Sequence, residues 1–169
     1  MKPQMNETVR FIDQSGAKPG AMDLWPAIVI PKETIDAEVE RLASLPRPAN
    51  GRRRSLIAHP RAGNGNGLAA GIQVALDVLL PGERTIPYRQ NSTQVNFVIQ
   101  GEGASVIGGR RFSTKLYDVC NTPSMQPYWH QNTGSGLFVR LTYFQRLAAG
   151  DDERPFRGRE SRAGRAGRA

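Results

Sequence analysis

Hydrophobic and polar residues alternate along several short segments in the second half of the chain. In the segment 71–80, aliphatic side chains occupy every second position: Ile72, Val74, Leu76, Val78 and Leu80. The segment 94–100, QVNFVIQ, has the same period, and a third apolar run follows at 137–145. Because successive side chains of a β-strand point to opposite faces, this pattern predicts strands that turn one face to a core.

Turn signals separate these segments at close intervals. Pro81 and Gly82 close the first strand, and Gly108-Gly109 is typical of a tight hairpin within ASVIGGRRF. Many short strands with helix only at the front of the chain favour an all-β sandwich or barrel.

One segment before the strands has a helical period. Residues 31–45 place Ile35, Val39 and Leu42 on one helical face, with a proline near the start and another after the end. The stretch PRPANGRRR that follows predicts an extended linker. The predicted organisation is an N-terminal arm with helix and linker at 1–67, a barrel at 68–148 and a basic tail at 149–169.

Charge adds less to this picture than its size suggests. The net charge is +8, but much of the arginine lies in residues 51–54 and in the tail. The tail has almost no large apolar side chains, so we expect it to be disordered, and the basic residues of 51–54 to be solvated. Neither segment mixes aromatic residues with basic ones as single-strand binders do, which argues against nucleic-acid binding.

The remaining bulk features indicate a cytoplasmic protein. A single cysteine, Cys120, cannot form an internal disulfide, and the first 16 residues lack the apolar core of a secretory signal. No run approaches the roughly 18 apolar residues of a membrane span.

Two stretches carry a family resemblance: GERTIPYRQNSTQVNFVIQGEG at 82–103 and YDVCNTPSMQPYWHQN at 117–132. They resemble the cupin superfamily, and within it the cupin domains of gentisate and hydroxynaphthoate ring-cleavage dioxygenases. The first cupin motif is Gly, five residues, His-x-His, three or four residues, Glu, six residues, Gly. This chain keeps the spacing from Gly82 to Gly101. The resemblance implies a cupin double-stranded β-helix, or jelly-roll barrel, with the helix-containing arm in front.

The metal ligands of the family do not follow the spacing. Tyr88 and Gln90 stand where the motif has histidines, and Gln94 stands at the glutamate position. His130 aligns with the histidine of the second motif. The resemblance implies three imidazoles on Fe(II), whereas a phenol, an amide and one imidazole are a poor set for that ion. We therefore predict a degenerate site without a metal or other cofactor, with His130 as a weak candidate ligand.

Strand parity predicts what the altered site contains. Asn96 shares a face with Gln94, and we expect this face to join Tyr88 and Gln90 in a polar, amide-rich pocket without charge. His130 is either a hydrogen-bonded structural residue or a participant in ligand binding or proton transfer. Arg140 lies either at an interface or the surface, or in the pocket, where its guanidinium would match a carboxylate.

Three functions remain open on this evidence. The favoured one is a metal-free cupin that binds a small aromatic or carboxylate-bearing molecule through Tyr88, Gln90, Gln94, Asn96, His130 and Arg140. The second is an enzyme, either a gentisate-type dioxygenase that uses Fe(II) or a metal-independent cyclase or isomerase with His130 and Tyr88 as acid and base. The third is a non-catalytic partner subunit of another cupin. We also expect a homodimer formed through the arm and one sheet.

Overall fold

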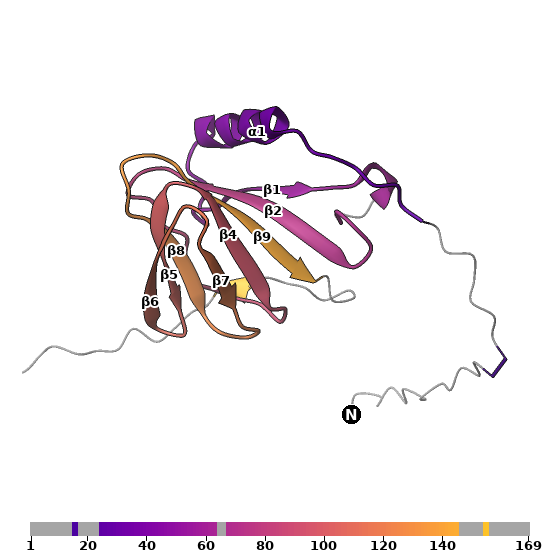
Figure 1. Cartoon of the computed structure of the whole chain (residues 1–169). Coiled ribbons are helices and arrows are strands. Elements are labelled where there is room, and N and C mark those ends of the chain that lie inside the picture. The colour runs from indigo at the N-terminus through magenta and orange to yellow at the C-terminus, as the bar shows by residue number, and fades with distance from the viewer. Residues whose placement is uncertain (1–14, 17–23, 64–66, 146–153, 156–169) are drawn as a thin grey trace, which may run out of the picture.

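The alternating segments form two antiparallel sheets that face each other in a computed structural model, which describes residues 15–16, 24–63, 67–145 and 154–155 (Figure 1). The first sheet has the strand order β1-β2-β9-β4-β7, and the second has the order β10-β3-β8-β5-β6. The elements are α1 (Lys32–Ser44), β1 (Arg53–Ile57), a 3₁₀ turn (Pro60–Ala62), β2 (Ile72–Leu79), β3 (Tyr88–Arg89), β4 (Gln94–Gln100), β5 (Glu102–Ile107), β6 (Arg110–Lys115), β7 (Val119–Thr122), β8 (Tyr128–Asn132), β9 (Phe138–Gln145) and β10 (Arg154–Pro155). The all-β prediction is confirmed, and the predicted helix lies within one residue of its expected bounds.

Helix α1 covers part of the outer face of the first sheet (Figure 1). Val39 and Leu42 of the helix are buried against Leu76, Val78 and Val139. The opposite face of β2, which turns toward the second sheet, is buried as well. The alternation in this strand therefore separates a helix-facing aliphatic set from an inner set, instead of separating core from solvent.

The predicted linker is wrong over its last residues. Arg53 begins β1, which pairs with β2 from Arg53 opposite Val78 to Ile57 opposite Val74. Arg52 and Arg53 are buried rather than solvated, and Arg53 forms an ion pair with Glu83. The arginines are buried instead of solvated because a charged group can be buried when an opposite charge and hydrogen bonds compensate for the lost water. The barrel sheet thus includes residues from 53 onward, and its predicted start at 68 is too late.

Most of the predicted basic tail lies outside the described residues, as do residues 1–14 and 17–23 of the arm. The backbone of Arg154–Pro155, which is described, pairs with β3. Within the described ranges, no helix has the length and apolar character needed to cross a membrane.

Two glycines let the sheets meet closely at the start of β5. Gly101 has a positive φ of 74°, and a Cβ atom there would lie 2.0 Å from the Leu137 carbonyl oxygen. A Cβ atom at Gly103 would lie 2.5 Å from the Gln131 carbonyl oxygen and 2.5 Å from the ring of Phe138. Phe138 is fully buried between the sheets, so the glycines make room for a core side chain.

We predict that Gly103→Ala destabilises the fold by about 1–3 kcal/mol, because the added methyl group overpacks the core around Phe138. Gly136→Ala is the matched control, since a Cβ atom there meets nothing within 4 Å. Urea unfolding of both variants measures the difference. Equal stability of the two variants would contradict the packing described here.

Candidate functional site

A row of charged residues crosses the inner face of the first sheet. Arg54 is opposite Asp77 in the pairing of β1 with β2, and Asp77 is opposite Arg140 in the pairing of β2 with β9. Arg54 donates two hydrogen bonds to the Asp77 carboxylate, from Nε at 2.7 Å and from a terminal nitrogen at 2.9 Å. Thr142 Oγ1 lies 2.7 Å from the same carboxylate. Asp77 is therefore a buried, fully partnered anion.

The charges around Asp77 decide its protonation state. Burial alone would raise the pKa of this carboxyl group, but the neighbouring guanidinium groups of Arg54, Arg140 and Arg52 outweigh burial and hold the pKa well below its usual range. Asp77 is thus ionised at neutral pH, and its charge is already matched by the bidentate contact with Arg54.

Arg140 is a second buried cation in this row, only 2% exposed. One terminal nitrogen donates to Asn96 Oδ1 at 3.3 Å, and the guanidinium lies 5.4 Å from the centre of the Phe138 ring. Its Nε has no hydrogen-bond partner among the described residues. Burial lowers the pKa of Arg140 to about 10, opposed by the charge of Asp77, so the group stays charged at pH 7. The interface or surface position considered for Arg140 is therefore wrong, and the residue lies inside the barrel.

Amide and phenol groups fill the space beside this charged row. Gln94 Nε2 donates to the Tyr128 hydroxyl at 2.7 Å, and that hydroxyl lies 3.4 Å from Gln90 Oε1. Tyr88 is opposite Tyr128 in the strand pairing, with 6.5 Å between the ring centres. The guanidinium of Arg52 lies 4.6 Å from the centre of the Tyr88 ring.

Asn96 links the amide group to the charged row. Its Nδ2 donates to Thr122 Oγ1 at 3.3 Å, and its Oδ1 lies 3.0 Å from Thr142 Oγ1. The six predicted site residues are all buried: Tyr88, Gln90, Gln94, Asn96, His130 and Arg140. The expectation of an uncharged interior is wrong, because Asp77, Arg54 and Arg140 put full charges there.

His130 enters the interior from the second sheet. Its Nδ1 lies 2.8 Å from Ser105 Oγ, and its backbone is held on both sides by Thr85, with N–H to Oγ1 at 3.1 Å and carbonyl to N–H at 2.9 Å. Burial, followed by the charge of Arg140, lowers the pKa of His130 well below its usual range. The imidazole is therefore neutral at pH 7 and engaged in structural hydrogen bonds.

This donor set does not fit an iron ion of the kind that the family resemblance implies. In the described part of the chain, no three His, Cys, Asp or Glu side chains come close enough to hold a metal. The motif positions offer a phenol at Tyr88 and amides at Gln90 and Gln94. Phenols ligate well only after deprotonation, and amides are weak donors to divalent iron.

Sequence reasoning missed two charged residues of the barrel interior, Asp77 and Arg54. A signal for Asp77 was present, because a carboxylate stands in the middle of the aliphatic segment 71–80. A charge at such a position is almost never buried without a partner, so an opposite charge on a neighbouring strand could have been inferred. Nothing in the sequence indicates that Arg54 is that partner, because the pairing depends on the register of β1.

Two facing antiparallel sheets in this strand order, with polar groups from both sheets inside, define a cupin barrel. The chain is a cupin by fold, as the motif spacing predicted, although no family model matches its sequence. It is 25% identical, over 132 residues, to 5-nitrosalicylic acid 1,2-dioxygenase of Bradyrhizobium sp; the match covers 74% of this chain and 60% of that protein. The chain is thus related to aromatic dioxygenases.

Solved structures give the same result for the fold. A mutant form of salicylate 1,2-dioxygenase from Pseudoaminobacter salicylatoxidans superposes with a TM-score of 0.65 at 19% identity, covering 80% of this chain and 41% of that one. A further structure of this dioxygenase has a TM-score of 0.62 at 20% identity, covering 67% and 33%. The chain therefore spans less than two thirds of the length of these relatives.

We predict that His130 makes stability fall as the pH decreases from about 6.5. Because the pKa of His130 is lower in the folded chain than in the unfolded chain, only the unfolded chain binds a proton in this range. The free energy of unfolding therefore falls by up to about 1.4 kcal/mol for each pH unit. Asp77 acts in a separate window, since the stability that it contributes is lost only below about pH 4. Urea unfolding between pH 8 and 5 should show a shallower slope for His130→Gln than for the wild type. Identical slopes would contradict a buried neutral imidazole.

Proposed function

We propose that this chain binds a small aromatic or carboxylate-bearing molecule inside its barrel, without a bound metal ion. The observation that carries the proposal is Arg140, a buried guanidinium whose Nε has no hydrogen-bond partner among the described residues. The relatives act, by their names, on salicylate and 5-nitrosalicylic acid, both of which are aromatic carboxylates.

The charge balance of the interior favours an anionic ligand. Asp77 is matched by the two hydrogen bonds from Arg54, which leaves the charge of Arg140 with the Asn96 amide, the Phe138 ring and a more distant carboxylate. A buried donor without a partner costs about 1–3 kcal/mol. A ligand carboxylate that accepts from Nε would remove that cost and neutralise the surplus charge.

The aromatic preference is supported by aromatic side chains that both sheets contribute to the interior. The Phe138 ring lies against Arg140, and the Tyr88 and Tyr128 rings lie near each other on the facing sheet. Aromatic pairs add roughly 0.5–1.5 kcal/mol beyond simple burial. Binding is proposed over proton transfer because the lowered pKa of His130 makes its imidazole a weak base, and its Nδ1 already lies beside Ser105 Oγ.

Calorimetric titration with salicylate, and with phenol as the ligand that lacks a carboxylate, tests this proposal. We expect salicylate to bind at least about tenfold more tightly than phenol, and Arg140→Gln to lose at least about tenfold in salicylate affinity, since hydrogen bonds to charged groups are worth about 1.5–3 kcal/mol.

Arg111→Gln is the control, because Arg111 is exposed and its contact is with Gln131. This variant should bind salicylate as the wild type does. Circular dichroism establishes that Arg140→Gln is folded, which we expect because Asp77 keeps its bond to Arg54. No binding of salicylate by the wild type, or unchanged affinity in Arg140→Gln, would refute the proposal.

A further inference from the structure

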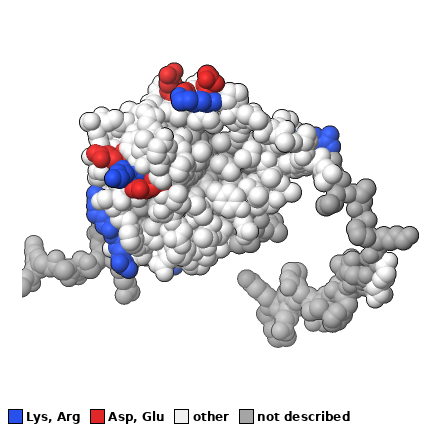
Figure 2. Space-filling view, viewed as in Figure 1, with Lys and Arg blue, Asp and Glu red and all other residues white. Residues whose placement is uncertain are grey.

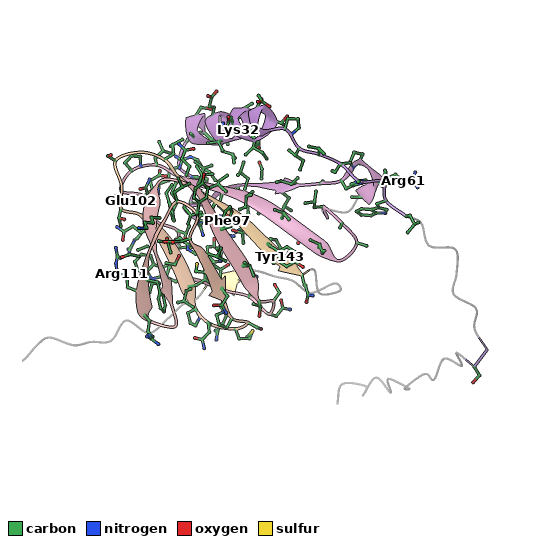
Figure 3. The ribbon with its side chains drawn as sticks, in the orientation of Figure 1. Lys32, Arg61, Phe97, Glu102, Arg111 and Tyr143 are labelled. Atoms are coloured by element: carbon green, nitrogen blue, oxygen red, sulfur yellow. The ribbon has the colours of Figure 1, made fainter. Side chains whose placement is uncertain are left out.

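Part of the outer face of the first sheet is left uncovered beside helix α1. The helix covers Leu76, Val78 and Val139, while apolar side chains further along the same face remain exposed or half-buried (Figure 3, where Phe97 and Tyr143 are labelled). This bare patch consists of Val74, Val95, Phe97, Tyr117, Val119, Leu141 and Tyr143. The strand pairings make it continuous, because Tyr143 is opposite both Val74 and Val95, and Phe97 is opposite both Leu141 and Val119.

The bare patch carries no charge, although 22% of the residues of the chain are charged. Arg53 is the only charged side chain on the outer face of the five described strands of the first sheet. It is buried and paired with Glu83. Figure 2 shows this face as a broad area without basic or acidic atoms below the helix. The largest apolar patch on a monomeric protein is often a functional surface, and larger contiguous apolar surfaces mark sites of protein–protein interaction.

The described part of the N-terminal arm before helix α1, residues 24–31 and called the arm from here on, extends the same uncharged surface. Residues 24–31, LWPAIVIP, include no charged side chain, and Leu24 and Val29 are 74% and 90% exposed. The arm is held in place by Trp25, which stacks on the His59 ring at 5.0 Å, and by a 2.9 Å contact between His59 Nε2 and the Pro26 carbonyl.

A groove of about 640 Å³ lies between the arm and the loop before β2. It is lined mainly by apolar side chains, which include Ile28, Ile30 and Leu68. A second cavity of about 220 Å³ joins Trp25 to Ile72 at the start of β2. The groove thus lies at the end of the strand that carries Val74 of the bare patch.

We propose that the bare patch and the arm form an interface with a second copy of this chain. Both a protruding apolar segment and an apolar groove lie on one chain, and a two-fold axis lets each copy offer its arm to the other. The net charge of +8 makes two copies repel, so an uncharged face is where they can approach. The bare patch alone is too small, because its four strands and about five residues per strand span only ~19 Å by ~17 Å. A stable interface buries about 800 Å² per partner, so the arm must contribute to the contact.

Sedimentation velocity of the full chain from 1 to 100 µM tests the interface. We expect a dimer that dissociates only at the low end of this range, and at least about tenfold weaker association in Tyr143→Lys and in Val29→Lys, because each buries an unpaired charge at the contact. Tyr143 lies in the bare patch and Val29 in the arm, so the two variants test the two parts separately.

Phe112→Lys is the matched control. Phe112 is 40% exposed on β6 of the second sheet, against 38% for Tyr143, so the two substitutions disturb the monomer to a similar degree. Thermal unfolding establishes that all variants are folded. Dimerisation unchanged in Phe112→Lys supports the proposal. A wild type that is monomeric at 100 µM, or a Phe112→Lys variant that dissociates as strongly as Tyr143→Lys, overturns it.

Discussion

The buried carboxylate of Asp77 is the group on which the arrangement of the barrel interior depends. Arg54 binds it from β1, and Thr142 lies against it from β9 while also meeting Asn96 of β4. Burying these charges is costly, and the cost is offset only when geometry and hydrogen bonds are complete. The contact with Arg54 therefore explains why a basic segment after a proline-rich stretch becomes a strand of the barrel.

Packing and hydrogen bonds that need no metal explain how a cupin barrel can keep its shape without its usual ligands. The glycines and the spacing of the first motif serve the packing of β5 against β9 and the turn before β3, and these needs remain whether or not a metal is bound. At the ligand positions, Gln90 and Gln94 hydrogen-bond with Ser92 and Tyr128. Two buried atoms of this network have no hydrogen-bond partner among the described residues, Gln94 Oε1 and Arg140 Nε. Because Arg140 carries a positive charge, we infer that the site selects an anion.

Sequence reasoning could predict the strands, the helix and the inward set of Tyr88, Gln90, Gln94 and Asn96, because period and motif spacing are local properties. It could not predict the pairing of Arg54 with Asp77, since that depends on the register between strands more than 20 residues apart. Sequence reasoning also could not predict that both faces of β2 are buried, because the position of α1 over the sheet is set by tertiary packing. The pairing of Arg54 with Asp77, together with Arg140, makes a charged interior where an uncharged one was expected.

The metal content of untagged protein, measured by plasma mass spectrometry before and after incubation with Fe(II) under argon, tests the central claim most directly. The account predicts less than about a tenth of an equivalent of iron, nickel or zinc in both samples, because amides and phenols bind such ions weakly. Close to one equivalent in either sample would contradict it, and would return the chain to the dioxygenase chemistry of its relatives.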